Sequence, residues 1–220
     1  YIPVSAVLPV YNGEQYLRDA IGSILTQTYT NFELIIINDG SRDRSDEIIR
    51  TYVDSRIRYV VQENQGLARA LNRGVSLAKG AFVARMDADD ISFPDRFRKQ
   101  VDFLSARPDV GMVGTWAEIW SGDRKTRRLH AHPVDHAILS FELLFDNPFV
   151  HSSVMLRREV FDTVGLYSTD TARQPPEDYE LWSRISRRYK MANIPEYLHV
   201  YREVPSSICR SGIEKTLILR

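Results

Sequence analysis

The first half of the chain alternates between short, almost entirely apolar runs and stretches in which apolar residues recur every three or four positions. The apolar runs, each short enough for a buried strand, are residues 4–10, 32–37, 57–62 and 81–87. The stretches with a helical period are residues 14–27, 43–53, 67–78 and 97–106. This alternation predicts an α/β fold in which a mostly parallel central sheet is covered by helices.

The second half of the chain has a less regular pattern. Strand-like runs and helical patterns alternate there, at residues 110–120, 134–145, 153–158, 177–189 and 197–203. The basic segment 122–128 is predicted to be a loop. We therefore expect a single domain over residues 1–220, in which a smaller mixed region, residues 108–220, extends the parallel half, residues 1–107.

Composition narrows the class of protein. The chain has 29 Lys and Arg residues and 29 Asp and Glu residues, so its formal net charge is zero. The net charge therefore provides no overall electrostatic attraction to nucleic acid. The single cysteine, Cys209, excludes an internal disulfide and a zinc site built from several cysteines. No apolar run reaches the length of a transmembrane helix. The sequence has neither a P-loop nor a GxGxxG motif, which disfavours kinases, ATPases and dehydrogenases.

Polar clusters follow three of the predicted strands. YNGE follows the first strand at residues 11–14, NDGS the second at residues 38–41, and DADD the fourth at residues 87–90. Ligands of open α/β sheets bind outside the carboxyl ends of the strands. We therefore expect these three loops to meet at one crevice.

The DADD cluster places three carboxylates, Asp87, Asp89 and Asp90, in four positions. Two like charges ~4 Å apart repel by about 4 kcal/mol at an effective dielectric constant of ~20. A divalent cation would remove this repulsion, and Mg²⁺ and Mn²⁺ prefer oxygen ligands. The alternative is a solvated loop or a helix cap, because Asp is common there.

Several other polar residues allow a functional interpretation beside a structural one. The Asp39 carboxylate ends a buried strand, where it can accept hydrogen bonds from a base or a ribose, or stabilise an Asx-turn. Asp178 and Glu177 open a helix, where a carboxylate can act as a general base or simply favour the helix dipole. Arg69 and Asn72 are candidate donors to a base or phosphate, or exposed helix residues.

Aromatic and histidine side chains are ambiguous in the same way. Tyr179 and Trp182 can stack on a sugar, although packing in the core is the commoner role of such residues. His151 and His199 lie in apolar surroundings, where a structural role is the default interpretation.

Five motifs occur in a fixed order: VSAVLPVYNGEQYL, FELIIINDGSRDRS, GLARALNRG, ARMDADDISFPDRF and PEDYELWSRI. Together they resemble the pattern of glycosyltransferase family 2 from about Val4 to Ser207. A lone DxD is a weak signal, whereas five ordered motifs are a strong one. The resemblance implies a GT-A fold, which is Rossmann-like, with residues 1–107 as the nucleotide-sugar-binding half and residues 108–220 as the acceptor-binding half.

The resemblance also implies an inverting, metal-assisted transfer of a sugar from a nucleotide-diphosphate sugar, a UDP-sugar first of all, to a glycan or lipid-linked acceptor. Its donor-binding positions match Pro9, Tyr11, Glu14, Asp39, Asn72, Asp87, Ala88 and Asp89, and Arg69 is expected to bind the donor beside them. Among these, Asp39 would bind the base, Asp87 the ribose, and Asp89 the Mg²⁺ or Mn²⁺ that bridges the diphosphate.

On the acceptor side, the ED pair of the family matches Glu177 and Asp178. Asp178 would be the catalytic base that deprotonates the acceptor hydroxyl opposite the leaving group, so that a single displacement inverts the anomeric centre. Glu177, Trp182 and His151 are expected on the same side.

Two positions depart from the family pattern. Leu71 stands where many relatives carry an Arg, and Val204 stands where relatives often carry a His that approaches the metal or diphosphate. The candidates to replace these two side chains are Arg69, Arg85, His151 and His199. The departures keep open a non-catalytic nucleotide-sugar-binding module, or one half of a larger glycosyltransferase. A sugar-1-phosphate nucleotidyltransferase is less favoured, because no Gly- and Arg-rich loop follows the first strand.

We expect a cytoplasmic protein with no nucleic-acid partner. The basic segment 122–128 and the apolar helix 134–145 allow peripheral association with the inner face of a membrane, or are respectively a solvated and a buried surface. The sequence leaves the sugar, the acceptor and the oligomeric state open.

Overall fold

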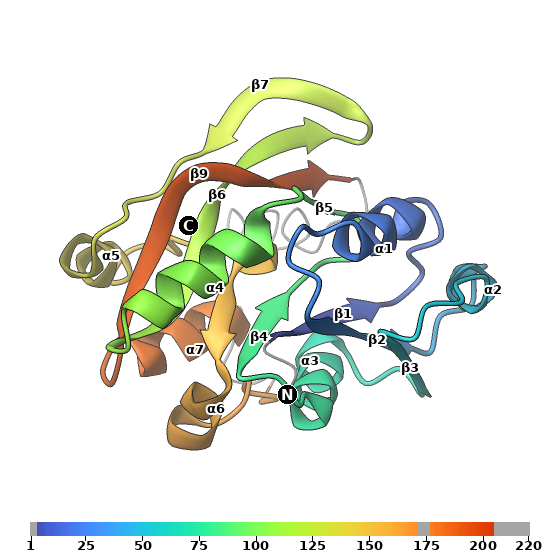
Figure 1. Ribbon diagram of the computed structural model, residues 1–220, viewed down its shortest axis with the longest axis horizontal. Helices are drawn as coiled ribbons and strands as arrows, with labels where there is room; N and C mark the ends of the chain where they lie inside the picture. Colours follow the sequence, from blue (N-terminus) through green and yellow to red (C-terminus); the bar gives the residue numbers. More distant parts are fainter. Residues whose placement is uncertain (1–3, 171–176, 205–220) are drawn as a thin grey trace, which may run out of the picture.

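The computed structural model describes residues 4–170 and 177–204, which form a nine-stranded sheet with helices packed on both faces (Figure 1). The strand order is β3-β2-β1-β4-β8-β6-β9-β5, and β7 pairs with β6 outside this row. The strands are β1 (Val4–Val10), β2 (Phe32–Asp39), β3 (Ile57–Gln62), β4 (Phe82–Arg85), β5 (Ile91–Ser92), β6 (Val110–Ser121), β7 (Arg124–His130), β8 (Met155–Arg157) and β9 (Lys190–Glu203). The helices are α1 (Leu17–Leu25), α2 (Ser45–Arg50), α3 (Leu67–Leu77), α4 (Arg96–Ala106), α5 (His136–Glu142), the 3₁₀ helix η1 (His151–Ser153), α6 (Arg158–Val164) and α7 (Glu177–Ile185).

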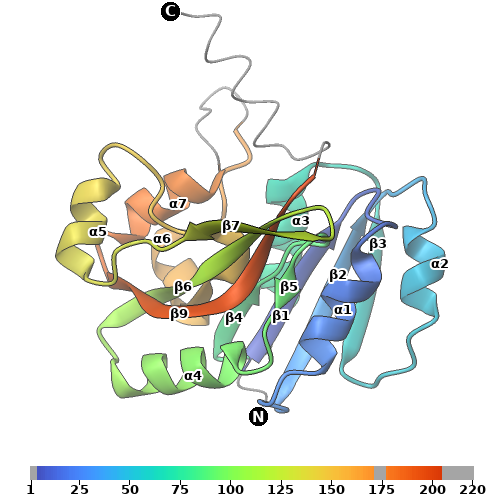
Figure 2. The same ribbon diagram turned by 90° about the horizontal axis from the view of Figure 1, so that it is seen from above.

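Alternate residues of the parallel strands enter different layers of the core. Leu34 and Ile36 of β2 pack with α1, α2 and α4, whereas Ile35 and Ile37 pack with α3 on the opposite face. Successive side chains of a strand point to opposite faces, so a strand covered on both sides must be apolar throughout. Figure 2 shows α1 and α3 on opposite sides of the sheet. The expected α/β fold with a mostly parallel sheet is confirmed.

Helix α3 approaches β1 closely at Gly74. A Cβ atom at this position would lie 2.3 Å from Cγ1 of Val7, which is far inside van der Waals contact. The absence of a side chain therefore sets how closely α3 packs on the sheet.

Strand β8 joins the parallel half to the rest of the sheet. It is antiparallel to both β4 and β6, with Val83 opposite Leu156 and Val113 opposite Met155. Two antiparallel steps leave β6 pointing the same way as β4, and β9 runs parallel to β6. The short strand β5 then pairs antiparallel with β9, and this pairing fastens the segment after the DADD cluster to the last strand.

The second half differs from the sequence prediction in several places. Residues 122–128, expected as a loop, instead belong largely to β7, which forms a hairpin with β6. The expected helix over residues 134–145 is confined to α5, and the expected strand over residues 153–158 divides into η1 and β8. The last strand begins at Lys190 rather than near residue 197, and α6 was not predicted.

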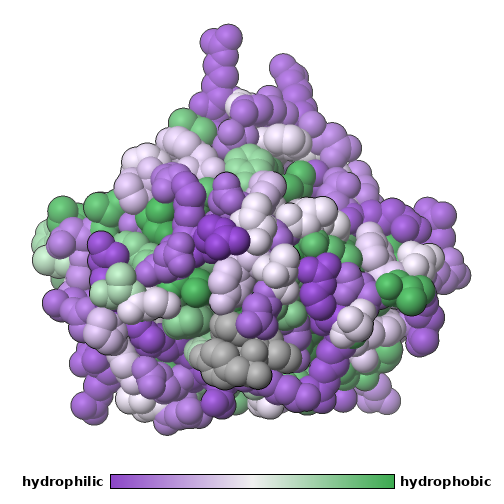
Figure 3. Space-filling model, viewed as in Figure 1, coloured by the Kyte–Doolittle hydropathy of each residue, from purple (hydrophilic) through white to green (hydrophobic). Residues whose placement is uncertain are grey.

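Helix α5 presents apolar side chains to the solvent. Ile138 is 53% exposed and Phe141 63%, and Leu144 and Phe145, just after the helix, are 70% and 76% exposed. Figure 3 shows hydrophobic surface over this helix, at the left of the view. Across the described ranges, no helix is both long and apolar enough to cross a bilayer.

Candidate active site

The three polar loops that follow β1, β2 and β4 meet at one edge of the sheet, as expected. The backbone N–H of Asn12 donates to Ser41 Oγ at 3.0 Å, which joins the first loop to the second. A Cβ atom on Gly13 would lie 3.4 Å from Cβ of Ala88, so the first loop also touches the DADD loop. The meeting follows from the parallel pairing of β1 with β2 and with β4, because parallel strands end at the same edge.

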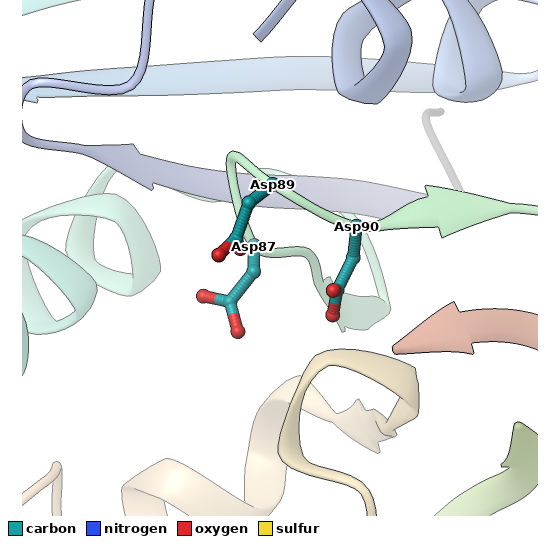
Figure 4. A group of neighbouring side chains, drawn as sticks. All are labelled: Asp87, Asp89 and Asp90. Atoms are coloured by element: carbon teal, nitrogen blue, oxygen red, sulfur yellow. The ribbon is translucent and has the colours of Figure 1, made fainter. Parts of the chain in front are cut away.

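The DADD loop holds its three carboxylates close together. Asp87, Asp89 and Asp90 each place one carboxylate oxygen within 4.8 Å of the others. Figure 4 shows the three side chains leaving the loop after β4 on the same side. Their partners differ, however, and this divides the cluster.

Asp90 is held by the last strand. One of its carboxylate oxygens lies 3.0 Å from His199 Nε2, and the other accepts the backbone N–H of Arg202 at 2.8 Å. Burial alone would raise the pKa of Asp90, but hydrogen bonds with His199 and Ser152 hold it below its ordinary value. The Arg202 guanidinium also donates to the main-chain carbonyl of Asp89 at 2.9 Å. Strand β9 therefore fixes the shape of the loop.

Asp87 and Asp89 are less buried than Asp90. Asp87 forms an ion pair with the buried Arg85, whereas no side chain of the described residues donates a hydrogen bond to the Asp89 carboxylate. Burial, followed by the charges of Asp87 and Asp90, raises the pKa of Asp89 to about 8. Burial also raises the pKa of Asp87, in spite of Arg85. These all-oxygen groups fit Mg²⁺ or Mn²⁺, whose charge would favour the deprotonated carboxylates.

Asp39 lies at the end of β2 and faces the start of α3. One oxygen of its carboxylate accepts from Gln62 Nε2 at 2.6 Å and from the backbone N–H of Gln65 at 3.0 Å, and the other accepts the backbone N–H of Gly66 at 2.8 Å. A carboxylate has roughly four acceptor positions, so one position stays open for a ligand. The residue thus has a structural role in addition to any part in binding.

The predicted residues of the first loop have separate surroundings. Pro9 is buried in β1 opposite Ile37, and the Tyr11 side chain is 50% exposed. Glu14 forms an ion pair with Arg44 at 3.1 Å, and the Arg44 backbone N–H is the first cause of the lowered pKa of Glu14. Glu14 therefore faces the start of α2.

The two predicted ligand-binding residues of α3, Arg69 and Asn72, also lie in different surroundings. Arg69 is exposed, whereas both ends of the Asn72 amide bond the backbone of Tyr167: Nδ2 donates to the carbonyl at 2.8 Å, and Oδ1 accepts the N–H at 2.9 Å. Leu71 is buried in the core between these two positions, so the family Arg would have no exposed place in this backbone conformation.

The candidate base, Asp178, lies in the first turn of α7 and is 7% exposed. Asn147 Nδ2 donates to its Oδ2 at 2.8 Å, and the backbone N–H of Tyr179 donates to its Oδ1 at 2.7 Å. Burial raises the pKa of Asp178 and of the neighbouring Glu177. The carboxylate is thus oriented by two donors and is more basic than an ordinary Asp.

His151 stands beside this carboxylate. Its Nδ1 lies 3.7 Å from Asp178 Oδ2 and 4.0 Å from Glu177 Oε1. The ring edge packs on Trp182, with centroids 5.6 Å apart at 84°. Trp182 is fully buried, which agrees with the packing interpretation of this residue.

Arg85 connects the base with the metal-binding candidates. The Arg85 side chain belongs to a residue that is only 3% exposed, and its guanidinium forms the ion pair with Asp87. Its positive charge also offsets part of the rise that burial causes in the pKa values of Asp178 and Glu177. The negative charge of Asp178 in turn raises the pKa of Asp87. The acid loop and the base therefore belong to one electrostatic cluster. Two surface hollows lie outside it, one bordered by Glu14 and Arg44 and the other by Trp120 and Arg202.

Sequence reasoning missed several residues of this cluster. Asn147, Tyr167 and Arg202 were not considered, and Arg85 only as a replacement for a family Arg. An Arg two residues before a row of acids, at the end of an apolar run, was the one visible signal. His199 contacts the acid loop through Asp90, and Val204 is 6% exposed.

The sequence matches the family model "Glycosyl transferase family 2" over residues 5–165. An uncharacterized glycosyltransferase of Haemophilus influenzae is 35% identical over 213 residues, which cover 90% of this chain and 65% of that protein. The putative glycosyltransferase EpsE of Bacillus subtilis is 34% identical over 207 residues, which cover 91% of this chain and 73% of EpsE. The chain thus spans about two thirds of the length of these relatives.

Two solved structures share the fold. TarS 1-349 of S. aureus in complex with UDP-GlcNAc aligns with a TM-score of 0.77 at 16% identity, over 95% of this chain and 61% of that one. The mannosyltransferase PcManGT of Pyrobaculum calidifontis, in complex with GDP-Man and Mn²⁺, aligns with a TM-score of 0.74 at 20% identity, over 98% of this chain and 61% of that one. The GT-A fold expected from the sequence is confirmed.

Proposed function

Because this chain belongs to glycosyl transferase family 2, we propose that it transfers a sugar from a nucleotide-diphosphate sugar, a UDP-sugar first of all, to a glycan or lipid-linked acceptor with inversion. The observation that carries the proposal is the cluster around Arg85, where the acid loop of Asp87 and Asp89 lies in the same electrostatic field as the buried Asp178. A binding site for a metal diphosphate and a general base are the two parts that such a transfer needs.

The donor would bind across the ends of β1, β2 and β4. Asp89, with Asp87 beside it, would hold Mg²⁺ or Mn²⁺, and the bound metal offsets the charge that develops on the leaving nucleoside diphosphate. Asp39 has one free acceptor position for the base. The nucleotide sugars bound to TarS and PcManGT, and the Mn²⁺ in the latter, support this assignment.

Asp178 would take the proton of the acceptor hydroxyl as that oxygen attacks the anomeric carbon. Asn147 and the Tyr179 backbone hold the carboxylate in place, and burial raises its pKa. A more basic carboxylate accepts a proton more readily, so the environment favours general-base catalysis. A single displacement by the activated hydroxyl would invert the anomeric centre.

A non-catalytic nucleotide-sugar-binding module, or one half of a larger enzyme, is the second candidate function. The buried Val204 and Leu71, in place of the family His and Arg, favour it. Isothermal calorimetry together with a transfer assay separates the candidates. A binding module would bind the donor in the calorimeter but would show no transfer to any acceptor.

The acceptor side would lie against the cytoplasmic face of a membrane. The exposed apolar side chains of α5 and the positive charges of β7 support this placement. Flotation with vesicles of anionic and of neutral lipid tests it, because the placement requires the protein to float with anionic vesicles.

The transfer itself is tested by incubating the protein with UDP- and GDP-sugars, Mn²⁺ and candidate acceptors, and measuring release of nucleoside diphosphate. Asp178→Asn should lower the transfer rate by roughly 10²–10⁴-fold, the range of general-base effects, while calorimetry finds donor binding unchanged. Asp162→Asn is the matched control, because Asp162 is an exposed residue of α6. An Asp178→Asn protein with full transfer activity would remove the proposed base.

A further inference from the structure

Tyr167 is a buried residue in the segment after α6, and it is held from the opposite half of the molecule. Asn72 of α3 bonds both its backbone N–H and its carbonyl, at 2.9 and 2.8 Å. The ring packs on Phe161 with centroids 6.3 Å apart. This double grip places the Tyr167 hydroxyl 3.1 Å from Nε2 of His151.

His151 therefore stands between a phenol and the carboxylates of the candidate base site. On one side, Nε2 faces the Tyr167 hydroxyl. On the other side, Nδ1 faces Asp178 Oδ2 at 3.7 Å and Glu177 Oε1 at 4.0 Å. The two ring nitrogens thus have different partners, and the proton of a neutral imidazole can be on only one of them.

Both partners favour the same tautomer. Burial raises the pKa of Tyr167 and lowers the pKa of His151 well below its ordinary value, so the phenol keeps its proton and the imidazole is neutral. The phenol O–H then donates a hydrogen bond to an unprotonated Nε2, so the proton of the neutral imidazole lies on Nδ1, toward the carboxylates. The other tautomer would turn a lone pair toward Asp178.

We propose that Tyr167 and His151 are positioning residues for the base: Tyr167 holds His151 in the Nδ1–H tautomer, and that N–H attracts and orients the Asp178 carboxylate. The Asn147 amide donates to Oδ2, His151 Nδ1 lies 3.7 Å from the same oxygen, and Oδ1 accepts from the Tyr179 backbone. Oδ1 keeps an acceptor position for the incoming hydroxyl proton. This role rests on the proposed function, in which Asp178 is the base.

The tautomer can be measured without any turnover. In protein labelled with ¹⁵N-histidine, the two ring nitrogens of His151, assigned by their loss in His151→Gln, should have the shifts of a protonated Nδ1 and an unprotonated Nε2. An Nε2–H tautomer would overturn the proposal, even if the protein proves to be an active transferase. Failure of transfer with every donor, in contrast, would count against the proposed function and leave this measurement intact.

The effect on catalysis is measured with Tyr167→Phe, which removes the hydroxyl and keeps the ring. We expect kcat to fall about tenfold, equivalent to about 1.4 kcal/mol, with KM for the donor unchanged. Tyr189→Phe is the matched control, because it removes a phenol that contacts Thr163 at 2.8 Å. An unchanged kcat in Tyr167→Phe, or an equal fall in Tyr189→Phe, would refute the role.

His151→Asn covers the case in which Tyr167→Phe folds poorly. Its amide can supply an N–H near the place of Nδ1–H without help from Tyr167. It should therefore retain more activity than His151→Ala in a protein that keeps Tyr167. Equal kcat values for His151→Asn and His151→Ala would show that the N–H is not what the base requires.

Discussion

The carboxylates of the DADD loop should respond in opposite ways to mutation. Asp90→Ala removes the acceptor for the Arg202 backbone N–H and the partner of His199 and Ser152, all of them buried. Asp89→Ala removes a carboxylate that no side chain of the described residues stabilises and whose pKa is raised to about 8. We therefore expect Asp90→Ala to destabilise the protein, and Asp89→Ala to leave the stability of the metal-free protein unchanged or to increase it.

The magnitude follows from the contacts. A buried polar group left without a partner costs about 1–3 kcal/mol; Asp90→Ala leaves the Arg202 N–H in this state, while His199 and Ser152 keep their contact with each other at 2.8 Å, so we expect a loss of about 3 kcal/mol. For a domain of this size, 1 kcal/mol corresponds to roughly 2–4 °C in Tm, so Asp90→Ala should melt roughly 6–12 °C lower in EDTA. Differential scanning calorimetry in EDTA measures both variants against the wild type.

When ligand is added, Asp89→Ala should become the variant that differs from the wild type in its gain of stability. With UDP and Mn²⁺ at about 100 times the dissociation constant, the wild type should gain about 2.7 kcal/mol, and Asp89→Ala should lose most of this gain. Equal melting temperatures of the two variants in EDTA would refute the division of the cluster into an anchored Asp90 and the less buried Asp87 and Asp89.

Two further predictions concern the base and the core. Because burial raises the pKa of Asp178, the transfer rate should increase with pH through an apparent pKa above the ordinary 3.8. Asn147→Leu should raise this apparent pKa further, because it removes a hydrogen bond to the charged carboxylate. A pH profile with the same midpoint in both proteins would contradict this. Gly74→Ala should destabilise the protein by about 1–3 kcal/mol in urea, because the new methyl would meet Val7, whereas the exposed Ser76→Ala should have little effect; equal midpoints of the two variants would count against the close packing of α3.

The parallel half could be predicted from the sequence because β1, β2 and β4 are buried on both faces. Every residue of β1 and of β2 is buried, so apolar runs mark these strands and their ends. In β7 the reverse holds: RKTRRLH is mostly exposed and charged, and only its pairing with β6 makes it a strand. For the helix predicted over residues 134–145, the sequence left a buried and an exposed apolar surface open, and in the structure Phe141 and Phe145 are exposed.

The candidate site could be predicted only where its residues adjoin a strand end or open a helix. The acid loop and Asp178 lie at such places, and their surroundings follow from local pattern. Asn147 and Tyr167 reach the site from the segments after α5 and α6, and no periodicity indicates which side chain turns inward there. Asn147 contacts Asp178, 31 residues away, and Tyr167 contacts His151, 16 residues away. Such contacts between distant segments cannot be recognised from local sequence pattern.

The hold of β9 on Asp90 has a consequence for the order in which a newly made chain matures. Asp90 precedes His199 by 109 residues and Arg202 by 112. At roughly 5–20 residues per second on the ribosome, Asp90 would wait roughly 5 to 20 s for these two partners to be synthesised. The nascent parallel half can pack earlier, but the contacts of Asp90 with His199 and Arg202 form only once β9 has emerged, so the proposed metal site would be completed after the strands that carry it.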